Sequence, residues 1–217
     1  MKRIFIALMG LMMISSTSVF AQASFGVKAG LNLSKMSGKA EGEKLDDIKM
    51  KPGFNIGAFA DFSFSDMFAL ETGLTIETKG FKIKNEEEMF GGNLESKTTF
   101  NVVYATIPVQ ARLNFSNFYV LAGPYIGIGV TGKLKTKVTY DGETEKEDDS
   151  IEFGDDAEES DLKRLDFGLG VGAGYEITDN FGVRLGYDLG LANLTPGGDK
   201  DNKLKNGSIN LSVTFKF

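Results

Sequence analysis

A strict two-residue alternation between apolar and small or polar residues constrains the fold of this chain more than any other feature. In the stretch DFGLGVGAGYEI (166–177), glycine occupies every second position from Gly168 to Gly174, and apolar residues stand between the glycines. A period of two is typical of a strand with one apolar face. The letters GLGVGA also match the dinucleotide-binding pattern, but that pattern works only where a strand ends and a helix begins. Here the alternation continues, so we interpret the stretch as a β-strand with one apolar face.

The same alternation recurs along the chain and predicts eight strands. Their connections alternate in length, with short ones at 65–66, 116–117 and 178–180 and long ones at roughly 35–52, 79–99, 131–161 and 192–206. Phenylalanine and tyrosine crowd the short-turn ends. An even strand number, short turns on one side, long loops on the other and aromatic girdles are typical of an outer-membrane barrel. The fold class expected is all-β, an eight-stranded antiparallel up-and-down transmembrane β-barrel, with strands at 25–34, 54–64, 68–77, 103–115, 118–130, 165–177, 181–190 and 208–217.

The N-terminus has the layout of a secretory signal peptide. Lys2 and Arg3 precede an apolar run from Ile4 to Ile14, and small residues follow it. The run is too short to span a membrane as a helix, which needs about 20 residues. We therefore expect residues 1–21 to be a signal peptide, cleaved after Ala21 or Ala23, and residues 24–217 to form a single barrel domain.

A soluble lipocalin-like barrel, with its apolar face inside, is the main alternative, because lipocalin strands alternate too. The non-apolar face, however, carries glycines together with charges of both signs. Such a face fills a narrow lumen well and would make an unusual solvent-exposed surface. The chain also ends on phenylalanine after an alternating strand. We therefore favour the membrane barrel.

Five segments, taken in order, resemble a known family. They are FGVKAGLNLS, ATIPVQARLNF, YVLAGPYIGIG, LDFGLGVGAGYEI and INLSVTFKF. The chain is similar to the PorT-like outer-membrane β-barrel proteins of Bacteroidetes over essentially all of its expected mature length. The resemblance implies an eight-stranded barrel of OmpA/OmpX-like shape in the outer membrane. It implies no activity, although one namesake of the family is tied to a protein-secretion apparatus.

The composition excludes several kinds of chemistry. The chain has no histidine and no cysteine, so histidine-assisted nucleophilic catalysis, thiolate chemistry and the usual zinc ligands are absent. Catalysis by carboxylates alone remains open in principle. A net charge of −6 argues against nucleic-acid binding, which relies on basic patches. We expect no enzyme activity and no cofactor.

The lumen of an eight-stranded barrel is just wide enough for its own side chains, whereas open channels need about 16 strands. Large side chains such as Phe59, Tyr104, Tyr119 and Tyr125 are expected inside, so a wide pore is excluded and a small gated channel stays an alternative. Counting from the short-turn ends also places three cations and three anions in the lower lumen. Because an unpaired buried ion is costly, we predict a charge-paired plug made of Lys28, Asp61, Glu71, Arg112, Glu176 and Arg184.

The third long connection is strongly acidic. Residues 141–161 contain twelve Asp or Glu and one lysine, Lys146. Such a run is usually a solvated, mobile segment, but its carboxylates, among them Glu147, Asp148, Asp149, Asp155 and Asp156, could also gather divalent cations, since oxygen ligands suit calcium and magnesium. Its two apolar residues, Ile151 and Phe153, could extend a strand or touch a partner.

These observations give a functional expectation. We expect a monomeric barrel surrounded by outer-membrane lipid, with a structural or interaction role and acidic loops outside the cell. Protein partners or divalent cations at these loops are the candidate ligands. A component of a protein-secretion apparatus and a small gated channel are the alternatives.

Overall fold

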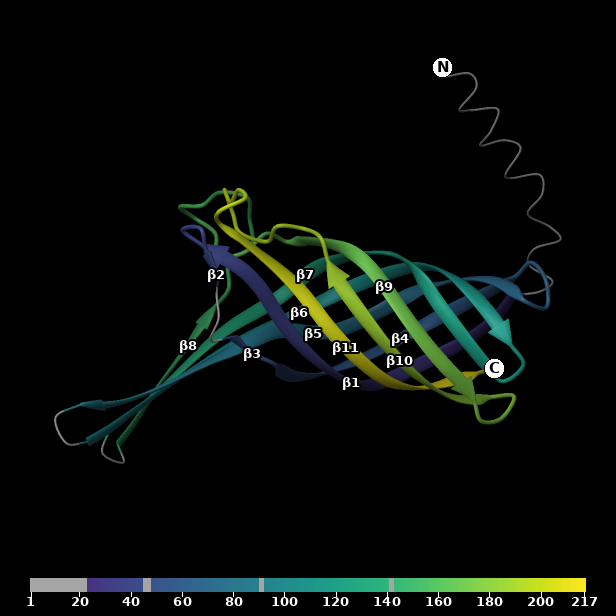
Figure 1. The fold of residues 1–217 in the computed structure, drawn as a ribbon, viewed down its shortest axis with the longest axis horizontal. Helices are drawn as coiled ribbons and strands as arrows, with labels where there is room; N and C mark the ends of the chain where they lie inside the picture. Colours follow the sequence, from purple (N-terminus) through teal and green to yellow (C-terminus); the bar gives the residue numbers. More distant parts are fainter. Residues whose placement is uncertain (1–22, 45–47, 90–91, 141–142) are drawn as a thin grey trace, which may run out of the picture.

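The protein forms a closed β-barrel in a computed structural model that describes residues 23–44, 48–89, 92–140 and 143–217. Eight strands form an antiparallel ring in the order β1–β4–β5–β6–β7–β9–β10–β11, and β11 pairs with β1 to close it (Figure 1). The predicted fold class is therefore confirmed. The eight strands are β1 (Ala23–Ala40), β4 (Lys51–Ser63), β5 (Phe68–Met89), β6 (Gly92–Phe115), β7 (Phe118–Tyr140), β9 (Leu165–Glu176), β10 (Phe181–Gly190) and β11 (Lys203–Lys216).

Three short strands lie outside this ring. β2 (Glu43–Lys44) pairs with β1, β3 (Ile48–Lys49) pairs with β5, and β8 (Glu143–Ser150) pairs with β7. The predicted signal peptide, residues 1–21, lies outside the described residues. Among the described residues there is no helix long and apolar enough to cross a membrane.

The period of two sorts the side chains between the outside and the lumen. Leu31 is 71% exposed, Leu211 59% and Ile56 56%, and each belongs to the apolar face of its strand. The alternate positions are buried, as the pattern of β4 shows with Asn55 at 4% and Asp61 at 3% exposure. The apolar face therefore points outward, the reverse of a lipocalin-like barrel and the arrangement that a barrel in lipid requires.

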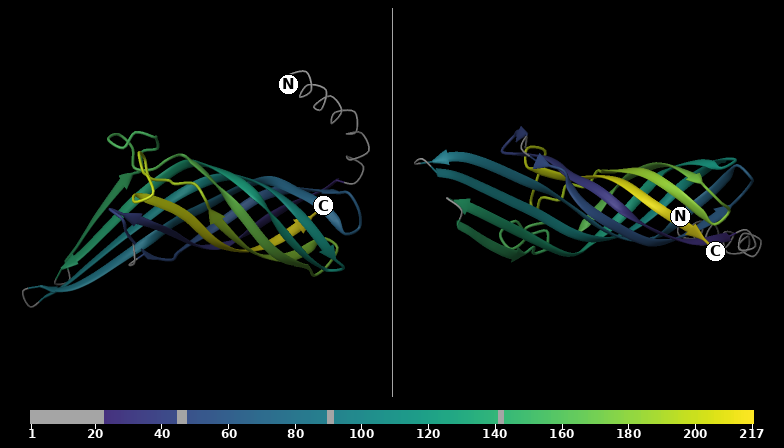
Figure 2. Two further views of the ribbon diagram at one scale, coloured as in Figure 1. Left: turned by 45° about the horizontal axis from the view of Figure 1, so that its top comes forward. Right: turned by 90° about the horizontal axis from the view of Figure 1, so that it is seen from below.

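The two ends of the barrel differ in their connections. Strands are joined at one end by turns of two to four residues, 64–67, 116–117 and 177–180, and the C-terminus lies at the same end (Figures 1 and 2). Phenylalanines line this end, with Phe115 and Phe118 stacked at 6.4 Å and Phe181 against Phe215 at 4.9 Å between ring centroids. The longer connections all lie at the opposite end, which we call the loop end.

Three of the four predicted long loops are in fact mostly strand, so these predictions were wrong, and in the first of them, 35–52, most residues belong to β1, β2, β3 or β4. The segments 79–99 and 131–161 continue β5, β6 and β7 well beyond the barrel, and β8 adds a fourth strand beside β7. We call this four-stranded part of the wall the extension (Figure 1). A β-bulge marks its base, where Val130 has no partner between the pairs Tyr104–Gly129 and Val103–Thr131. Bulges bend and twist a strand, and Figure 2 shows the extension leaving the line of the barrel wall.

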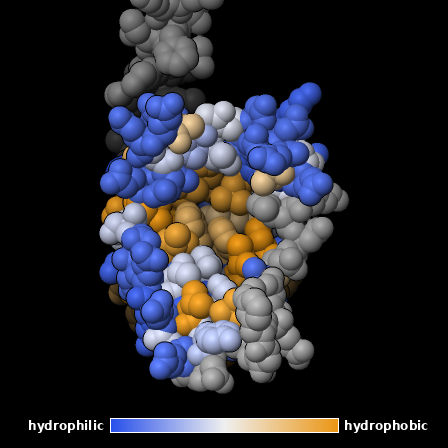
Figure 3. Space-filling view, turned by 90° about the vertical axis from the view of Figure 1, so that its left-hand side faces the viewer, coloured by the Kyte–Doolittle hydropathy of each residue, from blue (hydrophilic) through white to orange (hydrophobic). Residues whose placement is uncertain are grey.

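An apolar cap closes the loop end. Tyr104, Leu162 and Leu194 are almost fully buried, and they pack with five further buried residues, Met36, Phe100, Val102, Ile151 and Ala192. Ile151 continues the pairing of β8 with β7, because its N–H donates to the Gly132 carbonyl at 3.0 Å, but its side chain is 7% exposed within this cap and is not available to a partner. Phe153 packs against the same cluster. Viewed from the loop end, apolar residues are recessed behind a hydrophilic rim (Figure 3).

The glycines of β9 make room for large side chains of the neighbouring strand β7, with Tyr119 opposite Gly174 and Tyr125 opposite Gly168. A Cβ on Gly174 would lie 2.1 Å from Cζ of Tyr119, and one on Gly168 would lie 2.8 Å from Cε1 of Tyr125. The Tyr119 ring cannot easily move, because the Arg112 guanidinium lies 3.7 Å from its centroid and Arg184 Nε donates a 3.1 Å hydrogen bond to its hydroxyl. The alternating glycines are thus set by packing inside the lumen.

This packing predicts a difference between two glycines of neighbouring strands. Gly174→Ala should destabilise the barrel by about 1–3 kcal/mol, the usual cost of overpacking a filled interior. Gly186→Ala is the matched control, because the nearest atom to its new Cβ would be the Val171 carbonyl oxygen at 3.5 Å, and its cost should be clearly smaller. Urea unfolding of the barrel in lipid vesicles measures both. Equal costs would mean that the Tyr119 ring yields readily.

Candidate functional site

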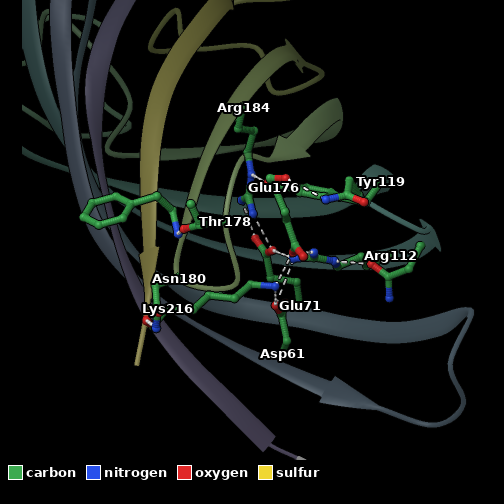
Figure 4. A network of polar contacts seen from close by, with 12 residues as sticks. Asp61, Glu71, Arg112, Tyr119, Glu176, Thr178, Asn180, Arg184 and Lys216 are labelled. Atoms are coloured by element: carbon green, nitrogen blue, oxygen red, sulfur yellow. Dashed lines mark hydrogen bonds and ion pairs between the residues drawn. The ribbon is translucent and has the colours of Figure 1, made fainter.

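Six charged side chains from six different strands meet near the short-turn end of the lumen (Figure 4). We call this group the lower layer. It contains three cations and three anions: Arg112, Arg184 and Lys216 with Asp61, Glu71 and Glu176. Period two directs each of them inward, and the closed ring brings them together.

Arg184 and Glu71 form a bidentate pair in the lower layer. Arg184 Nη1 donates to Glu71 Oε1 at 2.5 Å, and Nη2 donates to Oε2 at 2.6 Å. The two residues are 8% and 1% exposed. The planar guanidinium matches both carboxylate oxygens, which gives the pair a fixed geometry as well as strength.

Arg112 connects the remaining carboxylates. Its Nη1 donates to Asp61 Oδ2 at 2.9 Å and lies 3.7 Å from Glu71 Oε2, while its Nη2 donates to Glu176. Its Nε donates to the side-chain oxygen of Asn114 at 2.7 Å. Most donors of this guanidinium thus have acceptors, as a buried charge requires.

One member of the predicted plug, Lys28, is not part of the lower layer in the structure. Lys28 makes no ion pair with the other five predicted residues, and Lys216 occupies its place, contacting Glu176 and lying 3.6 Å from Asp61. The register explains the correction. Ser24, four residues before Lys28, lies opposite Asp61, so Lys28 sits about 13 Å further along the strand at 3.3 Å per residue.

The lower layer is accessible from the short-turn end. A vestibule of about 240 Å³ opens there, lined among others by Asp66, Asn114 and Ser116 and floored by Asp61, Arg112, Glu176 and Lys216. The side chains of Glu176 and Lys216 are 27% and 19% exposed, whereas that of Glu71 is 1% exposed. The vestibule therefore ends at the ion pairs.

A second charged group, which the sequence analysis missed, lies nearer the loop end. We call it the upper layer. Lys79 Nζ lies 3.1 Å from Glu77 Oε1 and 3.5 Å from Asp166 Oδ2, and it stands 4.5 Å from the ring centroid of Tyr125. Lys79 and Asp166 are fully buried. Thr106 donates to Glu77 at 2.7 Å and Asn206 to Asp166 at 2.9 Å.

A small polar cavity of about 60 Å³ separates the two layers. Lys28, Glu77, Arg184 and Asp188 line it together with uncharged polar residues such as Asn55 and Ser212. This volume is large enough to hold water, since one water molecule needs only about 10–15 Å³ of such space and a few polar partners. Lys28 therefore belongs to this internal cavity rather than to the lower layer.

The predicted acidic loop divides into two parts. Glu147, Asp148 and Asp149 lie in strand β8, which corrects their assignment to a loop, whereas Asp155 and Asp156 do lie in the connection between β8 and β9. Lys135 Nζ donates to Asp148 at 2.7 Å, and this bond holds the pKa of the Asp148 carboxyl below its usual value. No three acidic residues come close enough to hold a metal ion in the described parts of the chain.

The burial of the lower layer predicts that the free energy of unfolding depends strongly on its ion pairs. Arg184→Leu removes the bidentate partner of the buried Glu71 carboxylate, and the nearest described ion-pair partner left is Arg112, 3.7 Å away. It should lower the free energy of unfolding by about 3–5 kcal/mol, because an uncompensated buried charge remains. The double variant Arg184→Leu with Glu71→Leu should recover much of the loss. Urea unfolding in lipid vesicles measures both variants.

The control is an ion pair of the extension. Lys135→Gln removes the partner of Asp148, but both side chains are about half exposed, so the unfolding midpoint should hardly move. If the double variant were less stable than Arg184→Leu alone, the buried pair would not be coupled as the geometry indicates.

Solved structures with similar folds are outer-membrane barrels. Neisserial surface protein A is 15% identical, with 90% of this chain and 99% of that chain covered and a TM-score of 0.48. Ail, the attachment invasion locus protein of Yersinia pestis, is 18% identical, with 90% and 99% covered and a TM-score of 0.39. OprG from Pseudomonas aeruginosa is 16% identical, with 90% and 96% covered and a TM-score of 0.38. No curated protein matches the sequence.

The sequence itself matches a family. Residues 20–195 match the family described as outer membrane protein beta-barrel domain. The match includes seven of the eight ring strands, from β1 to β10. The closed antiparallel ring, the outward apolar face and this match agree on the outer membrane as the location. The chain belongs to the outer membrane protein beta-barrel domain family.

Proposed function

We propose that this outer-membrane barrel is an interaction protein whose lumen is closed and whose contacts are made by the extension outside the cell. The observation that carries the proposal is the contrast between the two parts. The barrel interior is filled by paired charges and aromatic rings, while three strands of its wall, β5, β6 and β7, continue beyond the loop end and β8 pairs beside them. The filled lumen supports contact at the surface rather than transport.

Closure of the lumen is supported at three levels. The lower layer, the upper layer and the apolar cap follow one another from the short-turn end to the loop end. Ion pairs that span several strands tie the wall together across the lumen, because Arg112 alone contacts carboxylates from β4, β5 and β9. A water or ion that crosses the barrel would have to displace each level in turn.

The extension offers an open strand edge. In the sheet, β8 has β7 as its single neighbour. Glu143, Glu145, Glu147 and Asp149 alternate along it and therefore share one face. Charged residues discourage random pairing at such an edge, while the free backbone groups can still accept a complementary strand. We infer that the partner is a protein with a basic, extended segment.

The resemblance to PorT-like proteins makes a place in a protein-secretion apparatus the second candidate. It predicts the same closed barrel but a different partner, a stable complex within the outer membrane. Catalysis is not part of either proposal, because the chain has no histidine or cysteine to serve as base or nucleophile.

The filled lumen predicts that the barrel conducts few or no ions. In planar lipid bilayers, the wild-type protein should show no steady open channel of porin size, because its lumen holds side chains rather than water. Arg112→Ala, which removes contacts to three carboxylates, should give at most small, intermittent conductance. Steady porin-sized currents from the wild type would refute the closed lumen and favour a channel function.

The orientation and the partner can be tested together, because the chain contains no cysteine. We expect Asp156→Cys, near the extension, to react in intact cells with a maleimide that carries a large polyethylene glycol chain. Asp179→Cys, in a short turn, should react only after the outer membrane is opened, as short turns face the periplasm. The opposite pattern would show that the extension faces inward.

A photoreactive cross-linker on the Asp156→Cys side chain then identifies neighbours of the extension. Replacing Glu145, Glu147 and Asp149 by serine should weaken cross-linking to a basic partner and leave the surface labelling unchanged. Cross-links to several secretion proteins that survive this replacement would favour the second candidate.

A further inference from the structure

The two faces of the extension have unlike chemistry. The face that continues the lumen side carries Phe81, Phe100 and Leu134 near the barrel, with Phe81 and Phe100 stacked at 5.1 Å between ring centroids. The face that continues the outer surface carries lysines on all four strands. These are Lys82 and Lys84 on β5, Lys97 on β6, Lys133, Lys135 and Lys137 on β7, and Lys146 on β8.

Four of these lysines form one row across the sheet. Lys84 pairs with Lys97, Lys97 with Lys137, and Lys137 with Lys146. Side chains directly opposite on neighbouring strands have Cβ atoms about 4.5–5.5 Å apart, and like charges at such positions destabilise the pairing. The repulsion within this lysine row therefore destabilises the sheet unless an anion neutralises the charges.

Carboxylates of the chain neutralise only part of this charge. Lys84 Nζ lies 3.4 Å from Glu95, and Lys135 Nζ lies 2.7 Å from Asp148. Lys97, Lys137 and Lys146 form no ion pair with any side chain that the structure describes. Lys97, Lys137 and Lys146 are all exposed, so their ammonium groups are accessible to an external anion.

The lysine face lies directly above the apolar band of the barrel. On β7, Ile126, Ile128 and Val130 are 49–56% exposed, and after the bulge the same outer face continues with Lys133. Two residues, Thr131 and Gly132, separate Val130 from Lys133, which is about 10 Å along the strand, and Lys137 of the four-lysine row lies about 13 Å beyond Lys133. Two other strands have lysines at the corresponding level, namely Lys35 and Lys39 on β1 and Lys203 and Lys205 on β11. We call all these outward lysines the lysine rim.

At the short-turn end, the residues that the structure describes include no counterpart to the lysine rim. The short turns 64–67, 116–117 and 177–180 contain Asp66 and Asp179 and no lysine or arginine. The charge asymmetry therefore distinguishes the two membrane surfaces. A general need for solubility would place lysines at both ends.

We propose that the lysine rim binds phosphate groups of lipids in the outer leaflet of the outer membrane, with the four-lysine row as its strongest site. Each ammonium group has three donors for phosphate oxygens, and the long lysine stems can lie along apolar surface while the charge reaches the headgroups. The lower lysines of the rim, such as Lys133, lie close to the edge of the apolar band, and this position favours a membrane lipid over a soluble anion as the ligand of the rim. The inference rests on the orientation proposed above, which cysteine labelling tests separately.

The experiment uses the full-length mature barrel in mixed detergent micelles with equal amounts of phosphatidic acid and phosphatidylcholine. Native mass spectrometry counts the lipids that each protein retains. The wild type should retain phosphatidic acid preferentially, and added salt should reduce the preference by screening. The variant K97Q/K137Q/K146Q should lower the ratio by about tenfold or more, as expected from removing three lysines beside an anionic surface.

Two control variants show whether charge on the rim is responsible. K97R/K137R/K146R keeps the charge and should keep the preference, and Lys200→Gln, in the exposed loop after β10, should have no effect. A gel shift on heating confirms that each variant is folded. An unchanged preference in the glutamine variant would overturn the proposal, as would wild-type protein that binds heparin or inorganic phosphate but not phosphatidic acid.

Discussion

The narrow lumen is the constraint on which the rest of the structure depends. Closing eight strands into a ring directs every second residue of each strand into an interior just wide enough for side chains. A large residue on one strand therefore requires a small one opposite, as Tyr119 requires Gly174. A charge likewise requires a counter-charge from another strand, as Arg184 requires Glu71. Both the packing and the ion pairs of the lumen thus follow from its narrow width. In the sequence, the alternating glycines of β9 show this constraint most clearly.

Much of the fold can be predicted from the sequence because contact with lipid requires an apolar residue at every second position of a strand. Outward residues must be apolar wherever they meet lipid, so the alternation is clear in all eight strands, and the short turns are located within a residue or two. Outside the lipid this requirement ends. In the segments FKIKN and KLKTKV the alternation continues, but lysine replaces the outward apolar residue. These segments were therefore interpreted as loops, although the period of two still indicated strands.

The lower layer shows how far alternation can locate a site. Parity correctly directs Asp61, Glu71, Arg112, Glu176 and Arg184 inward, and it would have directed Lys216 inward as well, since Phe215 and Phe217 flank it on the outer face. The height of each residue along the barrel depends on the stagger between strands, which alternation does not contain. The first strand has no short turn before it to count from, and Lys28 was accordingly placed too low. Lys79 was missed for a different reason, because the predicted strand ended at Glu77.

The bulge at Val130 lies between the lipid-facing part of β7 and its lysine-bearing part in the extension. An unpaired residue shifts the parity of β7, so that odd-numbered residues face the lumen before it and even-numbered residues after it. Without that shift, Leu134 would face outward with the apolar band, and Lys133, Lys135 and Lys137 would enter the capped interior beside Phe100. Burying three ammonium groups there without partners would be prohibitive. A single inserted residue thus allows one continuous strand to serve a lipid-facing wall below and a water-facing, lysine-bearing surface above.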